Sequence, residues 1–277
     1  MSKKTEAIGI FDSGMGGLTV AHAVSRLLPN ERILYFGDTA HTPWGDKSTE
    51  AIQQYSLKIA DLLLDQGCKT ILIACNTASA VALDVVKEAI RDRALVINVI
   101  DPVIAHIQEN CAEQKIGLIG TKQTIRSNAY KRRVDSLGKQ ISLASLATPL
   151  LVPLIEEGYA ENSVTKAVIQ DYLAHPTLKD ISTLILGCTH YPLIKPIILA
   201  QHGHKLQVID SAELAAIALK KALAQAQLLN DDKPPKKAAK SPHQFYISDH
   251  NEFFADLAQL FFTESVPVER YPLWDKK

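Results

Sequence analysis

The chain has 277 residues, of which 47% are hydrophobic and 22% charged, and its 30 basic and 30 acidic residues give a formal net charge of zero. This length and composition predict an ordinary globular protein and leave room for two domains. The balanced charge argues against a nucleic-acid-binding protein. No apolar run is long enough to span a membrane, so we expect neither nucleic acid nor membrane as a partner.

The first residues are charged and lead directly into an apolar run at residue 8, without the apolar stretch of a signal peptide. Four cysteines in a chain of this length are too few for a disulfide framework. We therefore expect a cytoplasmic protein with free thiols.

Short apolar runs alternate with amphipathic segments along the chain. Strands are predicted at residues 8–11, 33–36, 70–74, 96–99, 115–119, 142–146, 183–186, 207–209 and 245–247. Helices are predicted at residues 18–28, 48–66, 79–91, 101–110, 128–137, 161–173 and 213–229. The alternation is typical of right-handed βαβ units, so an α/β fold with mainly parallel sheets is expected. Residues 231–243 are charged, contain proline and lack apolar periodicity, which predicts a surface loop.

The first predicted strand leads into the sequence DSGMGG at residues 12–17. Its glycines let backbone amides approach a ligand, and Asp12 and Ser13 can orient one. The G-x-G-x-x-G dinucleotide fingerprint does not match, because Thr19 stands where the third glycine belongs. A turn that caps the following helix is the alternative explanation.

The second predicted strand leads into a long polar turn, GDTAHTPWG, at residues 37–45. A loop of this kind at the carboxyl end of a strand suits a ligand wall or a lid. Asp38 fits that interpretation and a simple capping role equally well.

Two cysteines each close an apolar run, in the sequences ILIACNT at residues 71–77 and LILGCTH at residues 184–190. The carboxyl ends of parallel strands are where α/β proteins bind ligands and where helices begin. The helix dipole there is expected to lower the pKa of a thiol. Two thiols in matching settings, Cys75 and Cys188, favour proton transfer on opposite sides of one carbon.

The other candidates are weaker. Cys68 and Cys111 lack the polar residues that follow the first two cysteines and are interpreted as structural. No cysteine or histidine spacing matches a metal site, so no metal is expected. Glu156 and Glu157 follow an apolar run and could tune a thiol or form a solvated face.

The chain resembles two related halves. IGIFDS at residues 8–13 has a counterpart in IGLIGT at residues 116–121, and the two cysteine segments are separated by nearly the same distance along the chain. Two copies of one βα unit would produce this agreement in spacing. Chance similarity is the alternative, because apolar strands that end in Gly and Thr are common in α/β proteins.

Five motifs occur in order: DSGMGG, GDTAHTPWG, ACNTASA, PLIEEG and GCTHYPL. Together they resemble the glutamate racemases of the aspartate/glutamate racemase superfamily, over about residues 6 to 268. The resemblance implies two facing α/β domains related by a pseudo-twofold axis, with the active site in the cleft between them. The domains would comprise residues 1–98 with 211–277, and residues 99–210. The resemblance also implies that the protein interconverts L- and D-glutamate without a cofactor and supplies D-glutamate for peptidoglycan. A homodimer is compatible with the resemblance.

The resemblance also implies roles for individual residues. Cys75 and Cys188 would be the catalytic acid/base pair, acting on D- and L-glutamate respectively. The groups that assist the thiols would be Asp12, Glu156 and His190. The residues that bind the substrate would be Asp12, Ser13, Trp44, Gly45, Asn76, Thr77, Thr121, Thr189 and His190.

Trp44 stands where the family usually has tyrosine, which questions any hydrogen bond from a phenol. Superfamily members that act on aspartate tend to carry Cys-Thr-Glu at the second cysteine, so Cys188-Thr189-His190 favours glutamate. The alternatives are a racemase for aspartate or another amino acid and a non-catalytic two-domain amino-acid-binding protein. A hydrolase or oxidoreductase would need only one thiol or a C-x-x-C pair, which the sequence lacks.

Overall fold

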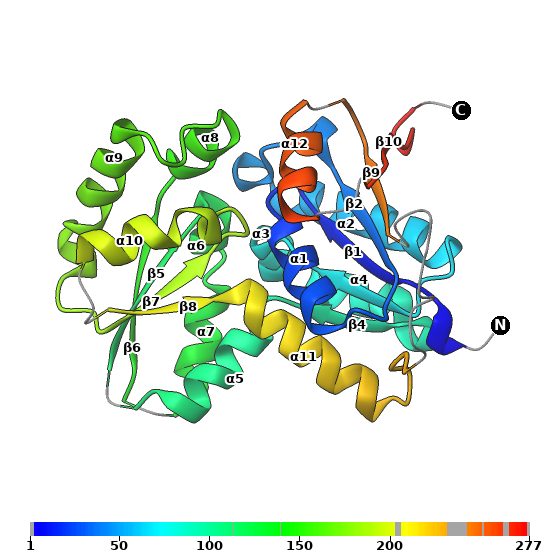
Figure 1. Cartoon of the computed structure of the whole chain (residues 1–277). Coiled ribbons are helices and arrows are strands. Elements are labelled where there is room, and N and C mark those ends of the chain that lie inside the picture. Colours follow the sequence, from blue (N-terminus) through cyan, green and yellow to red (C-terminus); the bar gives the residue numbers. More distant parts are fainter. Residues whose placement is uncertain are drawn as a thin grey trace.

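The protein forms two parallel β-sheets flanked by helices, as a computed structural model shows (Figure 1). The structure describes residues 3–112, 114–138, 140–202, 206–231, 243–250, 252–262 and 266–275. Most of the surface loop predicted at residues 231–243 lies outside these residues. Among the described residues, no helix combines the length and the apolar character that crossing a membrane requires.

The first sheet has the strand order β10-β9-β2-β1-β3-β4, and every neighbouring pair is parallel. Its strands are β1 (Ile8–Asp12), β2 (Ile33–Gly37), β3 (Thr70–Ile73), β4 (Leu95–Asn98), β9 (Gln244–Ile247) and β10 (Val268–Arg270). All residues of β1, β2 and β3 are buried, which is why these strands read as continuous apolar runs and do not alternate.

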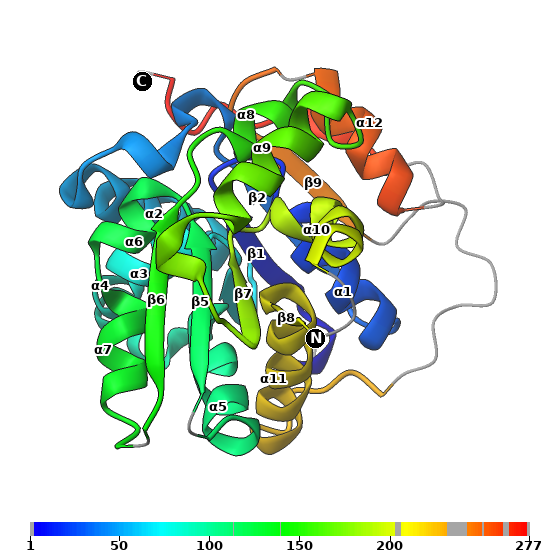
Figure 2. The same ribbon diagram turned by 90° about the vertical axis from the view of Figure 1, so that its left-hand side faces the viewer.

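The second sheet has the order β6-β5-β7-β8 and is also entirely parallel. Its strands are β5 (Lys115–Gly120), β6 (Ser142–Ala147), β7 (Thr183–Gly187) and β8 (Gln207–Asp210), and from left to right in Figure 2 they stand in the order β6, β5, β7, β8. The order β2-β1-β3-β4 in the first sheet matches β6-β5-β7-β8 in the second. The repeat predicted from the two half-sequences is thus present in the topology, and the two-domain α/β fold is confirmed.

Twelve α-helices are described. They are α1 (Leu18–Leu27), α2 (Thr49–Asp65), α3 (Asn76–Val81), α4 (Leu83–Ile90), α5 (Ile100–Asn110), α6 (Lys122–Arg126), α7 (Ala129–Asp135), α8 (Leu151–Glu156), α9 (Ser163–Leu173), α10 (Lys195–His202), α11 (Ser211–Gln225) and α12 (Glu252–Phe261). Helices α1, α11 and α12 pack on one face of the first sheet, and α2, α3 and α4 pack on the other. In Figure 1, α11 leads from the end of β8 in the second sheet toward the first. On the basis of this packing, we propose that the domain boundaries lie where the sequence predicted them, between residues 98 and 99 and between residues 210 and 211.

Several elements differ from the prediction. The helix expected at residues 79–91 begins at Asn76 and is interrupted at Ala82, which separates α3 from α4. The sequence did not predict α6, α8, α10, α12 or β10. Helices α6 and α8 span five and six residues, too few to show an amphipathic period, and β10 has three residues.

Candidate active site

Both candidate cysteines lie at the ends of central strands and border the same cavity. Cys75 directly precedes α3 and Cys188 follows β7, and the two residues are only 4% and 5% exposed. The cavity has a volume of about 240 Å³ and is lined by residues from both sheets' carboxyl ends. The predicted site residues that line it are Ser13, Trp44, Gly45, Cys75, Asn76, Thr77, Thr121, Glu156, Cys188, Thr189 and His190. A single small-molecule pocket therefore brings together thiols from the two halves of the chain.

Asp12 directly precedes Ser13, which lines this cavity, but Asp12 is not itself part of the lining. Its carboxylate is completely buried and accepts hydrogen bonds from the backbone N–H groups of Gly14 (3.1 Å) and Gly17 (3.0 Å). The hydroxyl of Thr189 donates to its other oxygen at 3.4 Å. Burial raises the pKa of Asp12, although nearby His190 and the backbone donors oppose the shift. Asp12 thus shapes the glycine turn and connects it to the segment of the second cysteine.

The glycine turn also packs closely against that segment. A methyl group added at Gly16 would lie 2.4 Å from His190 Nδ1 and 2.5 Å from Thr189 Oγ1. Contacts this short are not tolerated, so only glycine allows the turn to approach the second domain here.

The Cys75 thiol donates a weak hydrogen bond to Ser13 Oγ, with a sulfur–oxygen distance of 3.7 Å. Burial and the neighbouring Asp12 carboxylate raise the pKa of Cys75 to about 12, despite an opposing hydrogen bond from the backbone of Ala78. The expectation that the helix terminus lowers the pKa of this thiol is therefore wrong. Desolvation of a thiolate outweighs one backbone amide at the start of a six-residue helix.

Raising the pH from about 8 to about 10 is expected to destabilise the protein through Cys75. Because the folded pKa exceeds the unfolded value of 9.0, the folded state binds more protons, and stability is lost as the pH rises from 9.0 toward 12. One such thiol lowers the free energy of unfolding by about 1.4 kcal/mol at pH 10. Urea unfolding of the wild type and Cys75→Ser at both pH values measures this. Equal losses in the two proteins would contradict the prediction.

Cys188 is part of a short chain of polar groups. Its sulfur lies 3.7 Å from His190 Nδ1, and His190 Nε2 lies 3.0 Å from Glu156 Oε1. Burial alone would lower the pKa of His190, but the interactions with Cys188 and Glu156 prevail and raise it well above 6.5. An imidazolium at this position brings a positive charge next to the sulfur. Cys188 is followed by a 3-10 helix, Tyr191–Ile194, and not directly by an α-helix as the sequence suggested.

Hydroxyl and amide groups join the two domains beside the cavity. Thr77 Oγ1 lies 2.9 Å from Thr121 Oγ1 and 3.3 Å from Thr124 Oγ1. The buried hydroxyl of Tyr130 donates to Asn76 Oδ1 at 2.7 Å. The sequence did not single out Tyr130 or Thr124, because neither stands in a distinctive motif and only the packing of α7 and α6 against α3 brings them here.

The side chain of Trp44 is buried, and its indole N–H donates to Asp38 Oδ2 at 3.2 Å. A methyl group added at the next residue, Gly45, would lie 2.8 Å from the Cβ of Thr121. The loop that carries these residues therefore closes against the second domain. The tryptophan that replaces the usual tyrosine hydrogen-bonds to the protein's own carboxylate.

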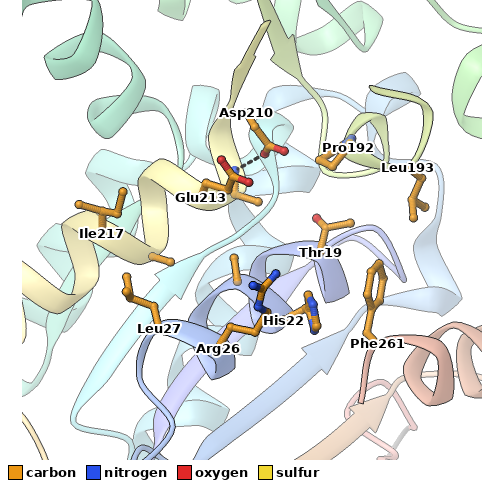
Figure 3. A pocket seen from close by; sticks show the side chains of 13 residues that line it. Thr19, His22, Arg26, Leu27, Pro192, Leu193, Asp210, Glu213, Ile217 and Phe261 are labelled. Carbon is orange, nitrogen blue, oxygen red and sulfur yellow. Dashed lines mark hydrogen bonds between the residues drawn. The ribbon is translucent and has the colours of Figure 1, made fainter. Parts of the chain in front are cut away.

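A second, larger cavity of about 460 Å³ lies between α1, α11 and the segment that follows Cys188 (Figure 3). Its wall combines apolar side chains with His22, Arg26, Asp210 and Glu213. Neither Cys75 nor Cys188 borders it, whereas both border the smaller cavity. Among the described residues, no group of three or more His, Cys, Asp or Glu side chains is placed to hold a metal ion.

The fold and the paired cysteines define a class that comparison with known proteins identifies. The Asp/Glu/Hydantoin racemase family matches residues 18–219, and the chain belongs to this family. At the level of single proteins, it is 42% identical to a glutamate racemase from Chlorobaculum parvum over 260 residues, which cover 94% of this chain and 93% of the relative. A glutamate racemase from Syntrophus aciditrophicus is 40% identical over 273 residues, which cover 98% of each chain.

Solved structures agree with these relatives. Glutamate racemase from Francisella tularensis, crystallised with D-glutamate, superimposes with a TM-score of 0.87 at 36% identity, covering 98% of this chain and 99% of the other. The isoform RacE1 from Bacillus anthracis gives a TM-score of 0.88 at 34% identity, covering 97% and 98%. The resemblance inferred from the five motifs is confirmed, and the chain is an isomerase of the glutamate racemase group.

Proposed function

We propose that the protein interconverts L- and D-glutamate without a cofactor, by a two-base mechanism in which Cys75 and Cys188 exchange one proton each with the substrate. One observation carries the proposal: the two strand-end thiols, one from each sheet, border a single cavity of about 240 Å³. The names of the similar proteins supply the substrate. The similar glutamate racemase from Francisella tularensis was crystallised with D-glutamate, and the similar protein from Chlorobaculum parvum carries the same name.

In each turnover, one cysteine as thiolate removes the proton from Cα, and the other as thiol delivers a proton to the opposite face. The first sulfur ends as a thiol and the second as a thiolate, so no net proton is gained or lost. A single residue would have to pass through the substrate to serve both faces. Two thiols from facing domains need no such movement.

The substrate itself is expected to adjust the thiols. The ammonium group of a bound amino acid brings positive charge into a cavity whose buried Cys75 otherwise holds its proton. An enzyme with a turnover near 10 per second needs a barrier of roughly 16 kcal/mol. Exclusion of water from a cleft strengthens every charge contact that lowers this barrier.

The remaining predicted residues receive roles from their positions. Protonated His190, held by Glu156, would stabilise the Cys188 thiolate, and Asp12 would hold the glycine turn beneath the substrate. The residues proposed to bind the α-carboxylate, the ammonium and the side-chain carboxylate are Ser13, Trp44, Gly45, Asn76, Thr77, Thr121, Thr189 and His190.

The biological setting follows from the substrate. D-Glutamate formed in this way would supply peptidoglycan synthesis in the cytoplasm, and we further propose that the protein works as a homodimer. Restored growth of a bacterium that requires D-glutamate would support the first point, and light scattering of the purified protein would test the second.

Polarimetry of purified protein with D- or L-glutamate, without any added cofactor, tests the activity. We expect the optical rotation to decay to zero from either enantiomer, and much less change with aspartate as the matched shorter substrate. Thermal stabilisation by glutamate with unchanged rotation would instead identify an amino-acid-binding protein. Racemisation of aspartate at the higher rate would move the assignment to that substrate.

A further inference from the structure

Asp38 is a completely buried carboxylate that no role proposed above includes. Ser248 Oγ and Trp274 Nε1 donate to its Oδ1 at 2.8 and 2.7 Å. Trp44 Nε1 donates to its Oδ2 at 3.2 Å, and His41 Nδ1 lies 2.9 Å from the same oxygen. The side chain makes no helix-capping hydrogen bond, so the capping alternative for Asp38 is wrong. One carboxylate instead connects the loop at residues 38–46, the end of β9 and the C-terminal tail.

Trp274 is one of the residues that hold the C-terminal tail, residues 271–275, in place. The indole ring makes edge contacts with His41 and Tyr55, at centroid distances of 4.6 and 5.5 Å. Lys58 Nζ lies 4.6 Å from the centre of the ring. His41 in turn stacks on Tyr55 at 4.2 Å. The tail is therefore packed against α2 and the 38–46 loop through a defined aromatic contact as well as a hydrogen bond.

The other side of the 38–46 loop faces the candidate active site. Trp44, Gly45 and Asp46 line the cavity of the two cysteines. Lys122 of the second domain pairs with Asp46 at 3.1 Å, and Thr121 meets the backbone at Gly45. The loop thus begins at the buried Asp38 and ends at the cavity wall, where it contacts the second domain.

We propose that Trp274 is a positioning residue for substrate binding: through Asp38 it holds the 38–46 loop against the cavity. The proposal rests on the proposed racemase function, because it needs a substrate in that cavity. Trp274 does not line the cavity of the two cysteines. It contacts the 38–46 loop through Asp38, which does not line the cavity either. Its removal should weaken substrate binding and leave proton transfer at the cysteines intact.

The size of the effect follows from the lost contact. A hydrogen bond to a buried carboxylate is strong, and a loop that has lost one of its anchors is closed for a smaller fraction of the time. Reduced occupancy of the closed loop weakens ground-state and transition-state binding equally, so KM rises while kcat stays. We expect a rise in KM of about 3- to 10-fold with kcat changed less than about twofold.

The variant Trp274→Phe tests this, because phenylalanine keeps an aromatic ring and removes the N–H. Asp275→Asn is the matched control: it removes the exposed tail ion pair between Arg270 and Asp275 (2.8 Å) and leaves Trp274 in place. Initial rates over a range of D-glutamate concentrations give KM and kcat for each protein. A purely structural tail would lower the melting temperature of Trp274→Phe without raising KM at 25 °C, and that result would overturn the proposal.

A second variant protects the test against misfolding. Should Trp274→Phe fail to fold, Ser248→Ala removes another donor to the same Asp38 oxygen without altering the tail. A raised KM in Ser248→Ala supports the positioning role of Asp38, and an unchanged KM contradicts it. Failure of the wild type itself to racemise glutamate would overturn the proposed function. An active wild type with an unchanged KM in the variants would overturn only the positioning role.

Discussion

Replacing either strand-end cysteine, as Cys75→Ser or Cys188→Ser, is expected to lower racemisation by about 10³-fold or more, since a positioned acid or base contributes roughly 10²–10⁴-fold. A serine hydroxyl is a much weaker acid than a thiol, so it neither forms the base nor delivers the proton readily. In the proposed mechanism, each enantiomer presents its Cα–H to only one of the two sulfurs. Each single variant should therefore still exchange the Cα proton of one enantiomer with solvent.

The experiment follows optical rotation and deuterium incorporation at Cα in D₂O, with each enantiomer separately. Cys68→Ser and Cys111→Ser are matched controls, because both cysteines are buried, form no disulfide and lie outside the cavity. These controls should keep wild-type activity. Racemisation at the wild-type rate by either Cys75→Ser or Cys188→Ser would exclude the two-base mechanism.

The variant His190→Asn is expected to lower kcat/KM by about 10²-fold, the lower end of the range for groups that assist proton transfer. His190 lies 3.7 Å from Cys188 Sγ, and its raised pKa keeps it protonated at neutral pH. Asparagine keeps a polar group in the space and removes the positive charge that we propose stabilises the thiolate. Enantiomers have equal free energies, so kcat/KM must fall by the same factor in both directions.

The pH dependence distinguishes this electrostatic role from a steric one. In the folded protein, His190 carries its positive charge below its raised pKa and loses the charge as the pH rises through that pKa. The difference in activity between wild type and His190→Asn should therefore narrow at alkaline pH. His175→Asn on the exposed surface is the control. A difference that stays constant with pH, or a loss below about threefold, would argue against the role.

Prediction from the sequence succeeded for structural elements that the local pattern of apolar residues defines. The nine predicted strands occur within one or two residues of their expected bounds, because buried parallel strands are continuous apolar runs. The cysteines stood out because a thiol followed by polar residues interrupts such a run. Helix α12 and strand β10 escaped detection, and with them the position of Trp274, whose partner Asp38 lies at the other end of the chain.

For Asp12 and Cys75, the sequence predicted that they belong to the site but not what surrounds each side chain there. The sequence placed both in the site, but only the structure shows that Asp12 does not line the cavity and instead supports the glycine turn. The direction of the pKa shift at Cys75 was predicted from the helix terminus alone. Burial reverses it, and burial depends on residues that surround the sulfur from several elements.

The sequence by itself determined the α/β class, the two half-repeats and the two thiols that close their central strands, because each depends on apolar patterning over a few neighbouring residues. The tertiary structure decided which groups meet across the domains: His190 with Glu156, Asn76 with Tyr130, and Asp38 with the C-terminal tail. These contacts form between segments far apart in the chain. Their distances and their effects on protonation depend on how the sheets and helices pack, which local sequence patterns do not specify.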